Sequence, residues 1–287
     1  MSTLLITGSG MLASALCECA HDRGLTVHVF SREQLDVTDR QAVLAAVGHL
    51  RPSLILHTAA LTRVHYCEEH PDEAQRVNAQ GTEHVVEAAG QAMATLIYFS
   101  TDYVFDGRQN WPYQEDAPPN PLNAYGRSKL AGEQAVAEYF RGHIVRTSGV
   151  FGVRAGGKPE RNFFRAVALQ LLIPGLRFPV VADQQVAVTH APHLAGMVFA
   201  LLAAGLPRVV HLTSAGSDSW RGWACRAAIA LGEPPERIIA LNSADTGDAT
   251  VRPAYSVLAS GWSPARGAIA MHPAGPAVEA YVKSLRT

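Results

Sequence analysis

A tyrosine and a lysine four positions apart are the residues of this chain best suited to acid–base chemistry. They are Tyr125 and Lys129, and they follow the segment Ser100-Thr101-Asp102. On a helix, residues four apart lie on one face with neighbouring side chains. A phenol has an ordinary pKa of about 10, and an adjacent ammonium group is expected to lower that pKa toward neutrality. Together with the Thr101 hydroxyl, the two side chains are predicted to hold a carbonyl oxygen and to give it a proton.

The tyrosine–lysine spacing alone is a weak signal, because it also occurs by chance on exposed helices. A second signature comes from a glycine-rich run of the type G-x-G-x-x-A, which follows a predicted strand and opens a predicted helix. The run consists of Gly8, Ser9, Gly10, Met11, Leu12 and Ala13. Its first glycine permits a tight turn, its second lets the backbone approach a pyrophosphate, and its alanine allows close helix–strand packing. We therefore predict a dinucleotide cofactor with its phosphates at the helix N-terminus.

The end of the second predicted strand bears on the choice of cofactor. An NAD site usually has an acidic residue here, which holds the ribose 2′-hydroxyl. This chain has Ser31 and Arg32 instead, and a guanidinium group suits a 2′-phosphate. NADP(H) is therefore the preferred cofactor, with NAD(H) as the alternative. Asp36 and Val37 are expected beside the adenine, although Asp36 is nearly as well suited to a turn or a helix cap.

Small residues follow the third predicted strand and suit the passage of a cofactor over the sheet edge. They are Ala59 and Ala60, with Leu61 next in the chain. Ser100, with the tyrosine and lysine above, completes the predicted cofactor contacts. Asn78 lies on the following helix, where a buried amide must be hydrogen-bonded, and it is expected to brace the loop after the fourth strand.

The elements that position these residues form a repeating pattern. Strands are predicted over 3–7, 26–30, 54–58, 95–100 and 143–147, and helices over 11–23, 40–50, 71–89 and 123–140. Apolar strands that alternate with helices indicate an α/β fold, a Rossmann-type doubly wound parallel sheet. Residues 1–150 are predicted to form an NAD(P)-binding Rossmann domain. Residues 151–287 are predicted to form mainly a smaller C-terminal substrate-binding lobe, and whether the chain crosses back to the first domain stays open.

Composition excludes several classes of protein. The net charge of −1 over 287 residues lacks the excess of basic residues that is typical of nucleic-acid binding. The start of the chain lacks the pattern of a signal peptide, and the longest apolar run, 194–206, is too short to span a bilayer. Four cysteines without zinc or disulfide spacing suit a reduced protein, so a cytoplasmic location is expected. His190 and His193 have the spacing of metal ligands but no evident third ligand, and no metal is predicted.

With these motifs in place, the chain resembles the extended short-chain dehydrogenase/reductases, and within them the dTDP-4-dehydrorhamnose reductase family. The resemblance covers nearly the whole chain. Its most diagnostic segments are 100–107 and 125–133, and further matches lie at 6–12, 35–39, 146–148, 162–163, 180–184 and 252–258.

The resemblance implies an enzyme that uses NADPH to reduce the C4 ketone of a nucleotide-activated, dTDP-linked 4-keto-6-deoxyhexose. It implies that Tyr125 is the proton donor, that Thr101 helps to bind the C4 oxygen, and that Lys129 holds the nicotinamide ribose. The substrate-binding residues that it implies are Asp102, Tyr103, Asn162 and Arg252. Arg252 is the natural partner for a diphosphate, because its planar fork matches phosphate oxygens.

The chain departs from the family pattern in three places. Its glycine turn is one residue tighter. The segment 183–189 is altered. Gly149 stands where these reductases often carry a tryptophan against the sugar, which predicts a more open pocket.

These departures leave other sugar specificities and an epimerase open. A 4,6-dehydratase is disfavoured because Asp102 is followed by Tyr103 instead of a second acid. A different class is a non-catalytic NADP-binding subunit like the methionine adenosyltransferase beta subunit, and the intact Thr101, Tyr125 and Lys129 favour catalysis over it. The expected partner is the nucleotide sugar, with no nucleic acid or membrane, and the expected assembly is a monomer or a homodimer.

Overall fold

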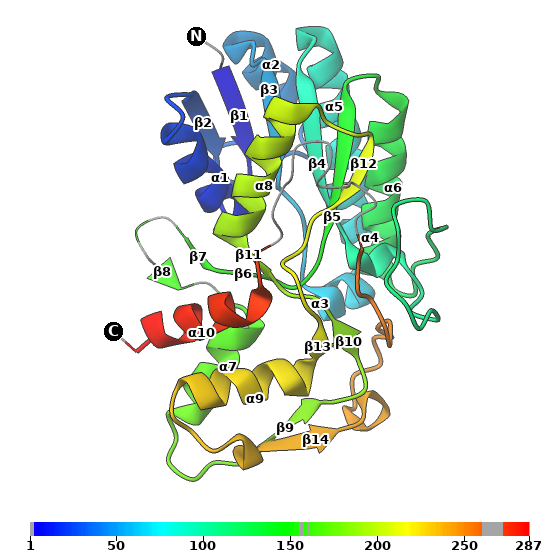
Figure 1. Cartoon of the computed structure of the whole chain (residues 1–287). Helices are drawn as coiled ribbons and strands as arrows, with labels where there is room; N and C mark the ends of the chain where they lie inside the picture. The colour runs from blue at the N-terminus through cyan, green and yellow to red at the C-terminus, as the bar shows by residue number, and fades with distance from the viewer. Residues whose placement is uncertain (1–2, 155, 157, 160, 260–271, 287) are drawn as a thin grey trace.

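The structure is a computed structural model that describes residues 3–154, 156, 158–159, 161–259 and 272–286. At its centre is a parallel sheet of six strands in the order β12-β5-β4-β3-β1-β2 (Figure 1). The strands are β1 (Thr3–Thr7), β2 (Thr26–Phe30), β3 (Leu54–His57), β4 (Thr95–Thr101), β5 (Gly142–Thr147) and β12 (Val209–His211). In β4 every residue after Thr95 is buried, as a central strand covered on both faces requires. The predicted α/β class with a parallel Rossmann-type sheet is confirmed.

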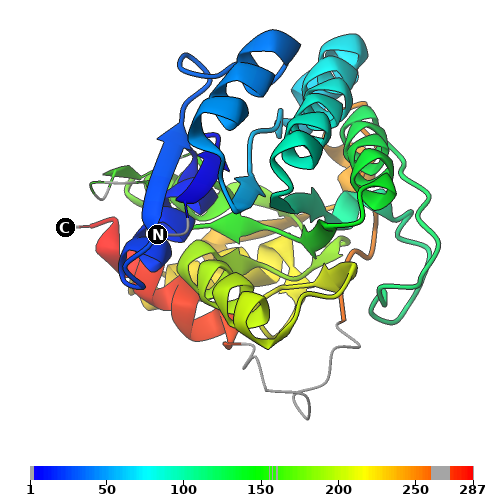
Figure 2. The ribbon, with the colours of Figure 1, turned by 90° about the horizontal axis from the view of Figure 1, so that it is seen from above.

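Helices cover both faces of this sheet (Figure 2). One face carries α1 (Met11–His21) and α8 (Ala191–Ala204), and the other carries α2 (Arg40–Leu50), α5 (Gly81–Ala92) and α6 (Ala124–Glu138). Each face has its own apolar core. Leu16 and Leu194 pack against the sheet in the first core, and Val43, Val85 and Val136 do so in the second. Burial of these apolar faces stabilises the three layers.

The second half of the chain returns to this sheet. β12 forms its edge and pairs with β5 in parallel, and α8 packs beside α1. Residues 191–211 therefore complete the six-stranded Rossmann-type sheet. From the sequence alone, it stayed open whether the chain crosses back in this way.

The remaining part of the second half forms a lobe below the carboxyl ends of the central strands (Figure 1). Its helices are α7 (Phe163–Leu171), α9 (Trp220–Ala230) and α10 (Ala274–Ser284), and its main strands are β9 (Phe178–Val181) and β14 (Ile238–Leu241). Shorter strands pair as β6 (Val150–Phe151) with β11 (Thr189–His190), β7 (Val153–Arg154) with β8 (Lys158–Pro159), and β10 (Gln185–Val186) with β13 (Asp218–Ser219). A separate core, with Phe164, Trp223 and Tyr281 at its centre, holds this lobe together.

The segment predicted as one helix over 71–89 is divided. It consists of α4 (Pro71–Gln75), a π-helical turn η1 (Arg76–Gln80) and α5. The short helix α3 (Val64–Glu69) precedes it, and the single turns η2 (Asp102–Val104), η4 (Pro235–Arg237) and η5 (Ser243–Asp245) lie elsewhere. A π-turn often marks a functional site. This one carries Asn78, whose contacts are described below.

Candidate active site

A cavity of about 600 Å³ lies at the carboxyl ends of β1, β3, β4 and β5. The strand order reverses between β1 and β3, and ligands of open α/β sheets bind at such a point. The cavity is lined by the predicted cofactor residues Gly8, Ser9, Gly10, Met11, Leu12, Arg32, Asp36, Val37, Ala59, Ala60, Leu61, Ser100, Tyr125 and Lys129. Ser31 is not among its lining residues, and the Ser31 backbone N–H donates to the Gln34 side chain instead.

The turn after β1 depends on a glycine. Gly8 has a φ of +89°, and a Cβ there would lie 2.9 Å from Thr58 Oγ1 and 3.0 Å from the Ala59 nitrogen. Both the dihedral angle and the crowding therefore require glycine. Gly10 is the N-cap of α1 and provides no side-chain cap. The first backbone N–H groups of the helix, which borders the cavity, therefore have no side-chain acceptor. Such an uncapped N-terminus suits a pyrophosphate.

The edge of the cavity where the adenine is predicted carries charge. The Arg32 side chain is 67% exposed, and its Nε lies 3.9 Å from Asp36 Oδ2. Asp36 Oδ1 accepts hydrogen bonds from the Thr38 backbone N–H and hydroxyl. Partial burial opposes ionisation of Asp36, but these hydrogen bonds and Arg32 lower its pKa. Asp36 thus has the turn role that the sequence allowed, and Arg32 keeps its guanidinium at the open edge of the cavity.

Thr101, Tyr125 and Lys129 converge on the same cavity. Lys129 is 2% exposed, and its Nζ lies 4.0 Å from the centre of the Tyr98 ring. Burial lowers the pKa of Lys129 to about 7, although Glu133 opposes the shift. Burial also raises the pKa of Tyr125, which Thr101 only partly opposes.

The prediction that Lys129 lowers the pKa of Tyr125 is therefore wrong for this structure. Burial of both side chains disfavours the charged form of each group. The phenol is accordingly protonated at neutral pH, which is the form that a proton donor needs.

Two buried polar atoms next to Thr101 have no hydrogen-bond partner among the described residues. They are Ser100 Oγ and Asp102 Oδ2. The other carboxylate oxygen of Asp102 accepts from Thr101 Oγ1 at 3.1 Å, and burial raises the pKa of Asp102 to about 7 against the nearby hydroxyls of Ser256 and Thr101. Both residues line the cavity, so they add hydrogen-bonding groups to its wall beside Thr101. With the glycine turn and the uncapped helix, they fit a dinucleotide and a polar substrate.

The helix that carries Tyr125 is fixed at its first turn. Asn123 Oδ1 accepts from the Gly126 N–H at 2.9 Å and caps the helix. A Cβ on Gly126 would overlap the Tyr103 carbonyl, so glycine lets this turn pack against η2. Glu68 on α3 accepts from the Ala124 N–H at 2.7 Å.

Asn78 braces a different loop from the one predicted. Its Oδ1 accepts from the Leu61 N–H at 2.7 Å, and its Nδ2 donates to the Leu61 carbonyl and to Ser128 Oγ. The amide therefore ties the loop after β3, not the loop after β4, to α6. This contact joins the predicted cofactor wall to the helix that carries Tyr125.

A second cavity, of about 570 Å³, adjoins the first within the C-terminal lobe. Phe163 and Trp220 line both cavities, and their ring centres are 4.7 Å apart. The predicted substrate residues divide between the two: Asp102 and Asn162 line the first cavity, and Tyr103 and Arg252 line the second. The other walls of the second cavity are largely apolar and include Val167, Phe178, Val180 and Val181.

Asn162 has its polar atoms engaged within the protein. Its Oδ1 accepts from the Arg165 N–H and caps α7, and its Nδ2 donates to Tyr281 Oη at 2.7 Å. The residue thus fixes the start of α7, which carries Phe163 into the junction of the two cavities.

Gly149 lines the first cavity, but its missing side chain is not what opens the pocket. Its φ is +52°, and a Cβ would lie 2.9 Å from the Ala187 carbonyl oxygen and 3.1 Å from Val188 Cα. A side chain at this position would therefore meet backbone. The aromatic surface at the junction comes instead from Phe163 and Trp220.

Sequence reasoning missed several residues of the site. Phe163 and Trp220 are preceded by Asn162 and Ser219, which cap α7 and α9. The capping pattern would have indicated helix starts but not a ligand surface. Arg154, whose guanidinium donates to the carbonyl and hydroxyl of Ser9, carried no local signal.

Two further observations concern only the part of the chain that the structure describes. Within it, no three His, Cys, Asp or Glu side chains are placed to hold a metal ion. None of its helices is long and apolar enough to cross a membrane.

The fold and the cleft together define a protein of the short-chain dehydrogenase/reductase type. The sequence profile described as "RmlD substrate binding domain" matches residues 1–287. The chain is 38% identical over 262 residues to a dTDP-4-dehydrorhamnose reductase of Streptomyces griseus, covering 88% of this chain and 84% of that one. It is 37% identical over 257 residues to a dTDP-4-keto-6-deoxy-D-glucose reductase of Streptomyces niveus, covering 88% and 87%.

A solved structure agrees with this match. The dTDP-4-dehydrorhamnose reductase of Bacillus anthracis, crystallised in complex with NADP, has a TM-score of 0.91 and 31% identity and covers the whole of both chains. The chain therefore belongs to the RmlD substrate binding domain family, and the resemblance to the dTDP-4-dehydrorhamnose reductase family is confirmed.

Proposed function

We propose that this protein is an NADPH-dependent reductase of the C4 ketone of a dTDP-linked 4-keto-6-deoxyhexose. The observation that carries the proposal is that the cavity lined by Thr101, Tyr125 and Lys129 adjoins a second cavity at Phe163 and Trp220. One has the glycine turn and the helix N-terminus of a dinucleotide site, and the other has apolar walls and Arg252. The activities named for the relatives from Streptomyces griseus and Streptomyces niveus, and the NADP bound to the Bacillus anthracis enzyme, support it.

The cofactor, when bound, supplies a hydride. The chain's own residues orient it: the Gly8 turn and the N-terminus of α1 face its pyrophosphate, and Arg32 at the open edge pairs with a 2′-phosphate. Lys129, which lines the cavity, holds the nicotinamide ribose. The Arg32 Nε lies 3.9 Å from Asp36 Oδ2, which is a long ion pair. The Arg32 side chain is therefore free to turn toward the more negative 2′-phosphate.

Tyr125 gives its phenolic proton to the C4 oxygen. Burial keeps this phenol protonated at neutral pH, and Thr101 stands beside it to bind the same oxygen. Asp102, which lines the same cavity, is placed to bind a sugar hydroxyl. The Phe163–Trp220 pair at the junction covers the apolar face of the deoxysugar, which leaves the nucleotide for the second cavity.

The test is the rate of NADPH consumption with dTDP-4-dehydrorhamnose, measured for the wild type and for Tyr125→Phe. We expect turnover in the wild type and a loss of kcat by about a thousandfold or more in the variant, with little change in NADPH affinity. A variant that keeps its rate would remove Tyr125 from the chemistry. Tight NADPH binding without turnover of any keto sugar would favour the non-catalytic NADP-binding subunit.

A second candidate substrate is dTDP-4-keto-6-deoxy-D-glucose. The relative from Streptomyces niveus named for this activity is 37% identical, nearly as similar as the rhamnose-type relative at 38%. The ratio of kcat/KM for the two sugars, measured on one enzyme preparation, decides between them.

A further inference from the structure

The segment that carries Arg252 is built around an aspartate. Asp248 Oδ2 lies 2.8 Å from Arg252 Nη2, and Asp248 Oδ1 accepts from the Thr250 N–H at 2.9 Å. The Asp248 backbone N–H in turn donates to Thr246 Oγ1 at 3.2 Å. The carboxylate thus fixes both the turn and the guanidinium that the turn presents. Hydrogen bonds from Thr250 and Arg252 lower the pKa of Asp248 despite its partial burial, so the carboxylate is charged.

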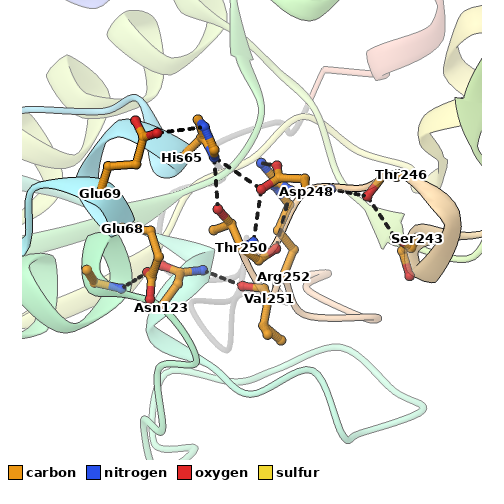
Figure 3. Close-up of polar contacts among 11 residues, drawn as sticks. His65, Glu68, Glu69, Asn123, Ser243, Thr246, Asp248, Thr250, Val251 and Arg252 are labelled. Carbon is orange, nitrogen blue, oxygen red and sulfur yellow. Dashed lines mark hydrogen bonds and ion pairs between the residues drawn. The ribbon is translucent and has the colours of Figure 1, made fainter.

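A histidine from the opposite half of the molecule reaches this aspartate. His65 Nδ1 lies 3.2 Å from Asp248 Oδ1 and 3.3 Å from Thr250 Oγ1, while His65 Nε2 lies 3.3 Å from Glu69 Oε1 (Figure 3). His65 belongs to α3, which follows the loop that walls the cofactor cavity at Leu61. The imidazole therefore joins the cofactor wall to the Arg252 turn.

A second contact joins the same turn to the catalytic helix. Asn123 Nδ2 donates to the Val251 carbonyl at 2.9 Å, while Asn123 Oδ1 caps the helix of Tyr125 (Figure 3). Asn123 is 1% exposed, so this amide has little freedom to move. The two contacts hold the residues just before Arg252, at Asp248, Thr250 and Val251, from two elements of the dinucleotide-binding half.

Both charged residues of this turn face the second cavity. Asp248 and Arg252 line it, and their side chains are 24% and 26% exposed. A guanidinium held on one side by a carboxylate keeps one orientation, which lowers the entropy lost when it binds a diphosphate.

We propose that Asp248 is a positioning residue that orients Arg252 toward the diphosphate of the nucleotide sugar, and that His65 holds Asp248 from the cofactor half. The inference rests on the proposed function. In this proposal the orientation of the Arg252 guanidinium depends on Asp248. It also depends on the contact of Asp248 with His65, which joins the two halves of the molecule.

The first test is steady-state kinetics of Asp248→Asn, which keeps the shape of the side chain and removes its charge. We expect the KM for the dTDP sugar to rise about tenfold while kcat stays within about twofold and the Kd for NADPH is unchanged. The matched control is Asp245→Asn, the same substitution on an exposed residue of the same segment that does not line the cavity. An unchanged KM overturns the proposal. A lower KM also overturns it, because Asp248 would then compete with the diphosphate for Arg252.

The second test asks whether Asp248 acts through Arg252. In an Arg252→Ala background, Asp248→Asn should cause no further rise in KM, since the positioned group is gone. A full tenfold effect in that background would mean a general structural role and would overturn the proposal. The His65→Gln variant should raise KM about threefold, because exposed contacts of this kind are weak. A wild-type KM in that variant removes His65 from the assignment.

Binding of dTDP to the same proteins separates this inference from the proposed function. We expect Asp248→Asn to weaken dTDP binding about as much as it raises KM. A wild-type protein that neither reduces a dTDP sugar nor binds dTDP overturns the proposed function and, with it, this inference. A wild type that does both, with an Asp248→Asn variant that binds dTDP equally well, overturns this inference alone.

Discussion

Replacing Lys129 with methionine should make the protein more stable while removing its activity. The Lys129 pKa is about 7 in the folded protein and 10.5 in its ordinary environment, because burial disfavours the ammonium form. At 1.36 kcal/mol per pKa unit, the buried lysine costs the folded state about 4 kcal/mol at pH 7 and about 2 kcal/mol at pH 9. The cation–π contact with Tyr98, which methionine lacks, offsets about 1 kcal/mol. At pH 9 the folded lysine is neutral and this contact is lost, so the expected net gain is about 3 kcal/mol at pH 7 and about 2 kcal/mol at pH 9.

The pH dependence has a definite sign. Between pH 7 and pH 10.5 the unfolded chain keeps the Lys129 proton and the folded chain does not, so the unfolded state binds more protons. The stability of the wild type therefore rises with pH across this window relative to the variant, and the penalty is complete below it.

Urea unfolding of the wild type and Lys129→Met without cofactor, at pH 7, 8 and 9, measures this difference. Lys283→Met, on an exposed position of α10, is the control and should change the free energy of unfolding little at any pH. A Lys129→Met protein that is less stable than the wild type at pH 7 would refute the reasoning. A gain of the same size at pH 7 and pH 9 would show that titration of the lysine is not its source.

Three more predictions, one of them with a control substitution, test the site and the structure around it. Arg32→Asp should raise the KM for NADPH at least about tenfold and leave that for NADH nearly unchanged; equal losses for both cofactors would contradict the 2′-phosphate assignment. Gly149→Ala should lower the free energy of unfolding by about 2 to 3 kcal/mol, because crowding by backbone adds to the positive φ. Gly175→Ala, with a φ of +70° and open space around its Cβ, should cost only about 1 kcal/mol, and equal costs would argue against crowding. Glu133→Gln removes the carboxylate charge that lies 2.7 Å from the buried Arg146 guanidinium and should lower the free energy of unfolding by about 3 kcal/mol. A loss below about 1 kcal/mol would mean that the surroundings of Arg146 relax.

Most residues of the candidate cofactor cavity could be predicted from the sequence because they lie in short, contiguous segments. The turn at Gly8 requires a residue that tolerates positive φ and a close neighbour, and the glycine-rich run follows a strand directly. Tyr125 and Lys129 needed only one helix to share a face. The alternation of apolar strands with helices was equally local, so the parallel sheet followed from it.

The second cavity was only partly predicted, because its walls come from distant segments. Arg252 was expected from the family resemblance, and Phe163 lay in a matching segment without a predicted role, whereas Trp220 and Asp248 had no signal of their own. Their approach depends on the packing of α7, α9 and the turn at 246–252 across the lobe. Gly149 illustrates the same limit. The sequence shows only that the family's tryptophan is replaced by glycine, whereas the structure shows that a side chain there would collide with the backbone of Ala187 and Val188.

The sequence by itself determined the α/β class, the glycine turn and the shared helix face of Tyr125 and Lys129, since dihedral preference and residue spacing are local properties. Only the tertiary structure decided how these groups ionise and what they face. Desolvation depends on every layer packed around a side chain, and it reversed the expected shift in the pKa of Tyr125. The link from His65 through Asp248 to Arg252 likewise exists only where the chain folds two halves together.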